Sequence, residues 1–204
     1  MELVGERWSL LIVRELMFGP RRFSDLRASL PGISAKTLTE RLEAMQSAGI
    51  ALRRELPPPG KVQVYELTEW GYRAEVALME LGRWAALSAK HDPTLPLSPA
   101  SLMMSMRTML QRDKAAGKKA DIGFDIGGEA FRARLADGEL AIRREPAEGA
   151  QAIFRVPAAT VLAGLLYAGM PPDALEAEAG LVIDGDRAAA LGYTTLFELP
   201  DKVG

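Results

Sequence analysis

The sequence contains 204 residues, with 25 Lys and Arg against 27 Asp and Glu, so its formal net charge is −2. This length suits two compact domains of about 100 residues each. No apolar run approaches the roughly 20 residues that cross a bilayer, and the first residues resemble no secretory signal. The absence of cysteine excludes disulfides and thiolate chemistry. We therefore expect a cytoplasmic protein with no membrane partner.

Two helices are predicted at the start of the chain. The first extends from Leu3 to Phe18, and its nearly continuous apolar stretch predicts that it is largely buried. Gly19-Pro20 ends this helix. The second follows Ser24, a favourable N-cap, and Pro31-Gly32 ends it. A tight turn is thus expected just before residue 34.

A third helix is predicted after this turn. Ser34 is its N-cap, the apolar residues Leu38, Leu42 and Met45 recur at helical spacing, and Gly49 supplies the C-terminal break. Because the apolar stripe faces the core, the polar residues remain outside. Those that face out are Lys36, Glu40 and Glu43, and those on the flanks are Thr37 and Arg41.

A hairpin and a long helix complete the first half. The extended segments Ile50–Glu55 and Val62–Leu67 are joined by Leu56–Lys61, which holds three prolines and a glycine. This pattern predicts a β-hairpin with a stiff tip. Thr68 then caps the final helix. The apolar stripe of that helix consists of Ala74, Ala77, Leu78, Leu81 and Ala85.

This order of elements is that of a winged helix-turn-helix, whose third helix places its N-terminal part against base edges in the major groove of double-stranded DNA. Residues 1–92 hold 13 Lys and Arg against 12 Asp and Glu, so binding would depend on a local basic surface. The same fold also serves protein contacts, and the pattern leaves both interpretations open. The candidate DNA-contacting residues are Ser34, Lys36, Thr37, Glu40 and Arg41 on the third helix, with Arg21, Arg22, Arg53, Arg54 and Lys61 for phosphate contacts.

A proline-rich segment divides the chain. Pro93, Pro96 and Pro99 are incompatible with a helix interior and push the preceding residues toward extended geometry. We therefore predict a first domain over residues 1–91, a semi-rigid linker over 92–99 and a second domain over 100–204.

The second domain is predicted to be α+β. A helix at 101–116 precedes four segments in which apolar and polar residues alternate, and Gly127-Gly128 and Asp137-Gly138 suit tight hairpin turns. This pattern predicts an antiparallel sheet with one buried face, covered by helices at 157–168 and 186–196. A short strand at 181–183 lies between these two helices, and Asp186 is the N-cap of the second. The four alternating segments are Ile122–Ile126, Phe131–Leu135, Leu140–Ile142 and Ala152–Val156.

No catalytic, metal or cofactor motif is found in the sequence. His91 is the only histidine, so neither a His-based metal cluster nor a Ser-His-Asp triad can form. Asp184-Gly185-Asp186 lacks the flanking oxygen ligands of an EF-hand loop. We therefore expect no enzyme activity and no cofactor. The apolar interior of the second domain is either a closed core or a pocket for an apolar ligand, lined by Phe124, Phe131, Phe154, Leu162, Leu166 and Phe197.

Five segments of the first domain carry a family resemblance. They are 6–16 (ERWSLLIVREL), 19–26 (GPRRFSDL), 30–34 (LPGIS), 37–42 (TLTERL) and 65–71 (YELTEWG). Together they resemble the HxlR family of winged-helix regulators. The resemblance implies a homodimeric transcription regulator that binds double-stranded DNA through its first domain, with the first and last helices in the dimer interface. Family members usually begin with a further stretch that often contains Cys-Pro, and a cysteine-based sensor is excluded for this sequence.

The second domain carries a different resemblance. Its predicted meander, Pro157–Leu162 and Gly180–Leu191 are similar to the sterol-carrier-protein (type two) domain over about residues 100–199. This resemblance implies a tunnel for a hydrophobic, lipid-like or sterol-like molecule. Tethered to a DNA reader, such a domain is expected to bind an effector that shifts the dimer geometry through the linker. The alternative is a lipid carrier in which the winged helix is a protein-interaction module.

Overall fold

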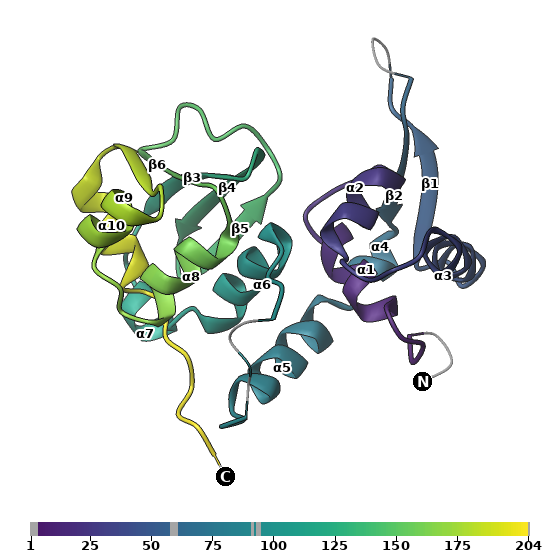
Figure 1. Cartoon of the computed structure of the whole chain (residues 1–204), viewed down its shortest axis with the longest axis horizontal. Helices are drawn as coiled ribbons and strands as arrows, with labels where there is room; N and C mark the ends of the chain where they lie inside the picture. Colours follow the sequence, from purple (N-terminus) through teal and green to yellow (C-terminus); the bar gives the residue numbers. More distant parts are fainter. Residues whose placement is uncertain (1–3, 58–60, 91, 93–94, 204) are drawn as a thin grey trace. The chain divides into compact units, whose positions relative to one another are not determined.

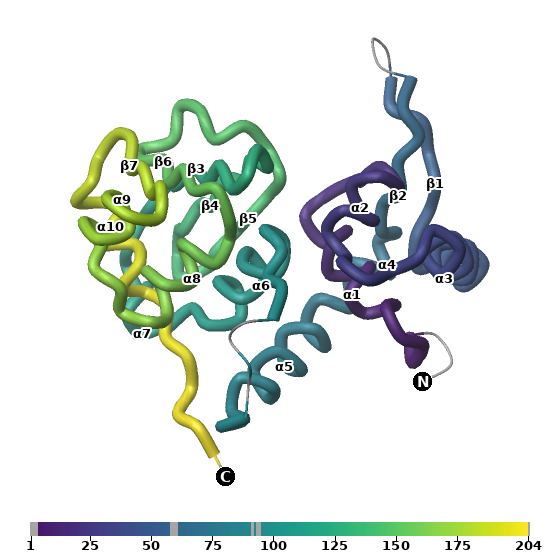
Figure 2. The backbone as a smooth tube through the Cα atoms, viewed as in Figure 1, coloured from purple at the N-terminus to yellow at the C-terminus, as the bar shows by residue number. Residues whose placement is uncertain are grey.

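The computed structural model describes residues 4–57, 61–90, 92 and 95–203. The predicted hairpin tip at 58–60, His91 and Pro93 lie outside the described residues. The chain divides into two compact units, Met1–Glu80 and Leu81–Gly204 (Figures 1 and 2). The dividing point lies inside a helix that precedes the predicted linker. Among the described residues, no helix combines the length and apolar character that a bilayer-spanning segment needs.

The first unit has the predicted order of elements, with three helices, a two-stranded hairpin and then further helix (Figure 1). In the hairpin the two strands are antiparallel, and Arg53 lies opposite Tyr65. The last helix begins in the first unit and ends in the second. The elements are α1 (Ser9–Leu16), α2 (Phe23–Ser29), α3 (Ala35–Ser47), β1 (Ala51–Glu55), β2 (Gln63–Leu67), α4 (Glu69–Tyr72) and α5 (Glu75–Ala86).

Capping chemistry explains where these helices begin. The Ser34 hydroxyl accepts a hydrogen bond of 3.0 Å from the backbone N–H of Thr37, which confirms the predicted N-cap of α3. Two helices differ from prediction. Helix α1 begins at Ser9 and not at Leu3, because Trp8 has a left-handed backbone with φ of 81°. The residue before α2 is Arg22, so Ser24 lies inside that helix.

The predicted long helix after the hairpin is broken into α4 and α5. Thr68 caps α4, and its hydroxyl also donates to the carbonyl oxygen of Gly49 at 2.7 Å. Gly71 of α4 packs so closely that an added Cβ would lie 2.1 Å from the carbonyl oxygen of Ile50. These contacts fix α4 at the base of the hairpin, and regular helix resumes only at Glu75.

The second unit is a five-stranded sheet with helices on one face (Figure 1). The strand order is β5-β4-β3-β6-β7. Helices α6, α8 and α10 contact the strands β5, β6 and β3, which places them over the apolar face. The elements are α6 (Pro99–Met109), α7 (Arg112–Ala115), β3 (Ala120–Ile126), β4 (Glu129–Ala136), β5 (Glu139–Arg143), β6 (Ala152–Val156), α8 (Ala159–Tyr167), α9 (Pro172–Glu178), β7 (Val182–Gly185) and α10 (Arg187–Thr194).

The prediction of an antiparallel sheet is wrong at one strand. The hairpins β3–β4 and β4–β5 are antiparallel as predicted, but β6 pairs with β3 in parallel. The connection from β5 to β6 crosses the sheet and returns to the opposite side of β3. Ala147 in this connection lies close to Gly123. A Cβ added to Gly123 would be 2.7 Å from the carbonyl oxygen of Ala147. A residue without a side chain at this position lets the connection cross.

In this unit the hairpin turns and the cap of α10 were predicted correctly, whereas the pairing of β6 was not. Gly127, Gly128, Asp137 and Gly138 all have positive φ, as tight hairpin turns require. The Asp186 carboxylate accepts from the N–H of Ala189, which confirms the predicted cap of α10. Helix α9 was not predicted. The predicted helix at 101–116 is instead α6 followed by the short α7.

Candidate nucleic-acid interface

Helix α3 exposes one continuous edge. Its inner residues Leu38, Leu42 and Met45 are buried. On the other side, the side chain of Lys36 is 86% exposed and its ammonium lies 3.9 Å from the Glu40 carboxylate. The residues of this edge, called here the α3 edge, are Ala35, Lys36, Thr39, Glu40, Glu43, Ala44 and Ser47.

Ser34 and Thr37 lie at the N-terminal end of α3 and are engaged with each other. Their hydroxyl oxygens are 2.8 Å apart, and the Ser34 hydroxyl also caps the helix. Ser34 is exposed and Thr37 is half-buried. Both hydroxyls therefore stabilise the helix start, where unpaired backbone N–H groups favour a phosphate.

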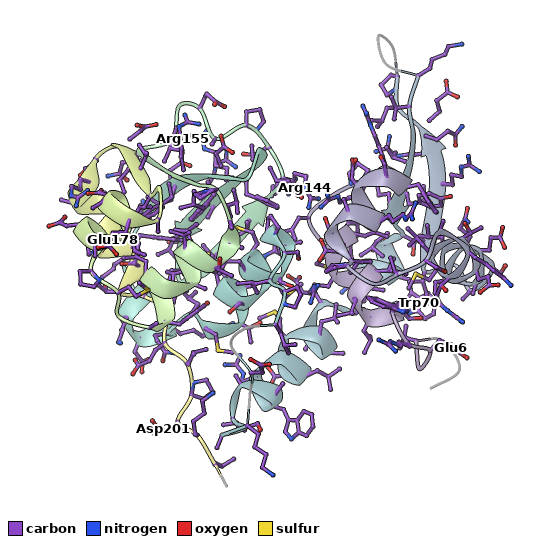
Figure 3. The ribbon with its side chains drawn as sticks, in the orientation of Figure 1. Glu6, Trp70, Arg144, Arg155, Glu178 and Asp201 are labelled. Carbon is purple, nitrogen blue, oxygen red and sulfur yellow. The ribbon has the colours of Figure 1, made fainter. Side chains whose placement is uncertain are left out.

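Arg41 lies at the flank of α3 and is held from within the same unit. Its guanidinium forms an ion pair of 3.4 Å with the carboxylate of Glu6, and its side chain is only 23% exposed. Glu6 lies on the segment before α1 (Figure 3). The neighbouring Trp8 packs near Gly32 in the turn between α2 and α3. The segment before α1 is thus tied to α3 and to the turn that precedes it.

The hairpin carries three of the predicted phosphate contacts. Lys61 is exposed, and Arg53 is exposed with its guanidinium 5.9 Å from the ring centre of Tyr65. Arg54 forms a short ion pair with Glu66 across the strands, and this hydrogen bond raises the pKa of Arg54. Arg54 therefore contributes less positive potential than Arg53 and Lys61.

Arg21 and Arg22 are neighbours in sequence but differ in burial. Arg22 is exposed. Arg21 is only 6% exposed, and its guanidinium lies 3.7 Å from the buried carboxylate of Glu15 in α1. Its backbone also exchanges two hydrogen bonds with Tyr65. Burial of Arg21 gives it a role inside the fold and leaves Arg22 as the accessible member of the pair.

Helix α5 presents large apolar side chains to solvent. Val76 is 70% exposed and Trp84 is 71% exposed. Soluble proteins rarely leave such groups together in water unless a partner covers them. The residues of this surface, called here the α5 apolar surface, are Val76, Ala77, Leu81, Trp84 and Ala85. Three of these five residues belong to the apolar stripe predicted from the sequence, and the two most exposed ones, Val76 and Trp84, do not.

The predicted pocket residues of the second unit are all buried. The rings of Phe124 and Phe154 stack at 5.6 Å, and Phe197 meets the same cluster through Tyr193. Phe131 lies opposite Phe124 in the sheet. The ring of Phe131 is covered by the guanidinium of Arg144, and Leu162 and Leu166 lie buried on α8.

Several residues that add polarity to these sites were not predicted from the sequence. Ser105 and Tyr167 were not singled out because their hydrogen bond joins residues 62 positions apart in the sequence. Glu6 gave none because its partner Arg41 is distant in sequence. Among the described residues, no group of three or more His, Asp or Glu side chains could hold a metal ion.

The similarity to known proteins lies in residues 3–93, which include nearly all of the first unit and the rest of α5. The family model described as HxlR-like helix-turn-helix matches residues 3–93. The HTH-type transcriptional regulator YodB of Bacillus subtilis is 39% identical over 83 residues, which cover 41% of this chain and 74% of that protein. The uncharacterized HTH-type transcriptional regulator YvaP of the same species is 35% identical over 86 residues, or 42% of this chain and 79% of that protein. A solved structure of the reduced form of YodB is 36% identical, covers 44% of this chain and 89% of that chain, and has a TM-score of 0.40.

Proposed function

Because the chain belongs to the HxlR-like helix-turn-helix family, we propose that it is a homodimeric transcription regulator that binds double-stranded DNA. The observation that carries this proposal is the α3 edge, which is capped by Ser34, exposed along its length and supported by a buried apolar stripe. Helix α3 has 13 residues. It is therefore roughly 20 Å long, enough to lie in a major groove about 12 Å wide.

Lys36 is the residue on the α3 edge best suited to contact a base. It is long, almost fully exposed and in the first turn of α3, where recognition helices reach the bases. Its pairing with Glu40 is an exposed contact worth little, so it can be exchanged for a base acceptor. Glu40 is then free to accept a hydrogen bond from a cytosine amino group.

Phosphate contacts are assigned to the exposed cations on neighbouring elements. These are Arg22 before α2, and Arg53 and Lys61 on the hairpin. Such contacts fix the position of the protein on the duplex without reading its sequence. Arg21 is left out of this set because its burial beside Glu15 makes it inaccessible.

The α5 apolar surface is assigned to a second copy of this chain. A two-fold dimer presents the same surface from both protomers, so one apolar helix face is sufficient to build it. Trp84 supplies the large aromatic area that anchors such interfaces. Two protomers would then bring two α3 edges to successive turns of DNA, about 34 Å apart.

The second unit is assigned to an effector that is a hydrophobic small molecule. The support is the buried cluster of Phe124 and Phe154, to which Phe197 is joined through Tyr193. A ligand alters DNA affinity only if it binds one dimer geometry better than another. Titration of the DNA complex with candidate ligands tests this coupling, and an unchanged affinity for DNA at ligand saturation would contradict it.

The DNA-binding proposal is tested by capture of genomic DNA. The full chain is immobilised, incubated with sheared genomic fragments, washed at increasing salt and the retained DNA sequenced. We expect a small set of sites with two related half-sites about 10 base pairs apart. The variant Lys36→Ala should lose these sites, whereas Lys118→Ala, which removes the same charge from the second unit, should keep them. Retention of unselected DNA alone by the unaltered chain would refute a sequence-specific regulator.

A further inference from the structure

The C-terminal end of α5 receives two hydrogen bonds from residues 116 positions further along the chain. The ammonium of Lys202 donates a hydrogen bond of 2.8 Å to the carbonyl oxygen of Ala86. The backbone N–H of Val203 donates one of 2.8 Å to the carbonyl oxygen of Leu87. Val203 also forms an isolated parallel bridge with Ser88. All of these residues belong to the second compact unit.

These two bonds complete the C-terminal cap of α5. The last carbonyl oxygens of a helix have no partner within the helix, and lysine side chains or later N–H groups commonly satisfy them. The N–H groups of Leu87 and Ser88 already bond back to carbonyl oxygens of the last turn. The carbonyl oxygens of Ala86 and Leu87 come next, and their donors are Lys202 and Val203. The cap of α5 is therefore built from two distant parts of the sequence.

The segment that supplies this cap is anchored at its other end in the interior of the second unit. The N–H of Glu198 donates to the carbonyl oxygen of Met109 at 3.2 Å. The ring of the preceding Phe197 meets that of Tyr193 edge-on, with 5.0 Å between the ring centres, and both side chains are buried. Residues 198–203 are called here the strap, and Phe197 is called its root.

The strap is short and partly rigid. Three residues separate Glu198 from Lys202, so the chain between the two can span at most about 14 Å. One of these residues is Pro200, whose ring fixes its φ angle. Leu199 and Pro200 are also half-buried. A displacement of the root should therefore reach the cap of α5, because the strap has little freedom to absorb it.

The capped turn carries part of the α5 apolar surface. Trp84 and Ala85 lie in the last turn of α5, and Trp84 is 71% exposed. Helix ends fray when their carbonyl oxygens lose partners, and frayed residues no longer hold their side chains on one face. The strap therefore stabilises the backbone that presents Trp84.

We propose that the strap is a conformational link through which the interior of the second unit controls the last turn of α5. With the strap docked, the turn is capped and Trp84 is held in place for a second copy of this chain. With the strap released from Ala86 and Leu87, the turn frays and self-association weakens. This link is separate from the proline-rich linker. Only its effect on self-association rests on the proposed dimer, so the cap itself is tested on a monomer.

The first test measures amide hydrogen exchange of Leu87 and Ser88 by NMR in the full chain. All samples carry Trp84→Glu, which removes the anchor of the proposed dimer. Val203→Pro deletes the N–H that caps α5, whereas the control Val203→Ala shortens the side chain and keeps that N–H. We expect exchange about threefold to tenfold faster with proline than with alanine, the change for one hydrogen bond worth roughly 0.7–1.4 kcal/mol.

The second test asks whether the root and the cap are coupled. Phe197→Leu loosens the root and should accelerate exchange of Leu87 at least about twofold. With Val203→Pro already present, the cap is lost and Phe197→Leu should have no further effect on that amide. Phe154→Leu makes the same substitution in the aromatic cluster but outside the strap, and it should leave the exchange of Leu87 unchanged.

The third test measures self-association by sedimentation equilibrium, with Trp84 restored. The double variant Lys202→Ala/Val203→Pro should raise the dissociation constant of the dimer at least about threefold. This factor corresponds to a last turn that is formed in about one-third of the molecules. The control Lys118→Ala/Val203→Ala loses the same charge but keeps both capping bonds, so it should associate as the unaltered chain does.

The proposal is overturned by any of three results. Val203→Pro and Val203→Ala give equal exchange rates for Leu87, Phe197→Leu accelerates this exchange equally with and without Val203→Pro, or the double variant dimerises with unchanged affinity. An unaltered chain that stays monomeric at every concentration contradicts the proposed dimer, and the exchange rates alone then decide whether the strap controls the last turn of α5.

Discussion

Glu6 and Arg41 form an ion pair of 3.4 Å that ties the segment before α1 to helix α3. The Glu6 carboxylate is largely exposed, whereas Arg41 is mostly covered. The carboxylate of Glu6 thus already binds the guanidinium of Arg41 beside the α3 edge. Any phosphate that approaches Arg41 has to compete with this carboxylate.

Replacement of Glu6 tests that competition. Glu6→Gln removes the negative charge and keeps the shape of the side chain. We therefore expect the dissociation constant for DNA to fall about twofold to fivefold at about 0.1 M salt. Fluorescence anisotropy with a labelled duplex measures it. Glu69→Gln, which changes the net charge equally at an exposed pair on α4, should produce less than half of this effect. Equal effects would mean that only net charge matters.

Lys36 and Lys61 are predicted to play different roles. Lys36→Ala should weaken binding to a selected site by about 1–3 kcal/mol and relax its sequence preference. Lys61→Ala should weaken binding to all sequences similarly and reduce the salt slope by about one. Titrations of selected and scrambled duplexes at several salt concentrations separate the two. A uniform loss from Lys36→Ala would make Lys36 a phosphate contact.

Trp84 should be essential for dimerisation and dispensable for folding. Trp84→Glu places a carboxylate in the α5 apolar surface, where pairing would bury it without a partner. We expect sedimentation velocity to show a monomer. Urea unfolding, at a protein concentration low enough for the unaltered chain to be monomeric too, should give free energies of unfolding within about 0.5 kcal/mol of each other, because exposed sites contribute little. Trp70→Glu, the same change at an exposed tryptophan of α4, should leave the dimer intact.

The Glu15–Arg21 pair is expected to stabilise the first unit. Glu15 is fully buried, so Glu15→Ala leaves the Arg21 guanidinium buried without its carboxylate. We expect the free energy of unfolding, measured with urea, to fall by about 3 kcal/mol. Glu69→Ala, at an exposed pair, should cost less than about 0.5 kcal/mol. A loss of DNA affinity from Glu15→Ala without any loss of stability would contradict this assignment.

Asp121 and Arg132 should make stability depend on acid pH. Two hydrogen bonds of 2.6 Å from Arg132 hold the pKa of Asp121 below its ordinary value of about 4. Because the folded pKa is lower than the unfolded one, the pair stabilises the fold above the unfolded pKa and loses this contribution as pH falls through the folded pKa.

Thermal unfolding between about pH 3 and pH 7 checks this dependence. Asp121→Asn should lower stability at neutral pH and flatten the decline in acid. Asp201→Asn, at an exposed carboxylate near the chain end, is the control and should leave the curve unchanged. Parallel curves for Asp121→Asn and the unaltered protein would show that Asp121 is not the group responsible.

Features set by neighbouring residues were predictable from the sequence. The caps at Ser34, Thr68 and Asp186 follow from short polar side chains before apolar repeats, and each was predicted. The glycines of the hairpin turns follow from the positive φ that those turns need. The apolar stripe of α3 was predictable because the spacing of its apolar residues can be recognised within a single segment.

Features set by distant residues were not predictable. The parallel pairing of β6 depends on how the chain crosses the sheet at Gly123 and Ala147, and alternation within a strand is the same in both orientations. The burial of Arg21 depends on Glu15 in another helix, so a basic pair in sequence gave no sign that its members differ. The hydrogen bond between Ser105 and Tyr167 joins helices α6 and α8, which lie far apart in the sequence.

The close approach of Gly71 to Ile50 limits how the sequence can diverge. A methyl group at position 71 would collide with a main-chain oxygen, and no choice of rotamer can move that oxygen aside. Relatives that retain both the hairpin and the helical turn after it should therefore carry glycine at this point, whatever DNA they recognise. An alanine at position 71 would indicate a protein in which the hairpin lies at a different angle to the helix that follows it.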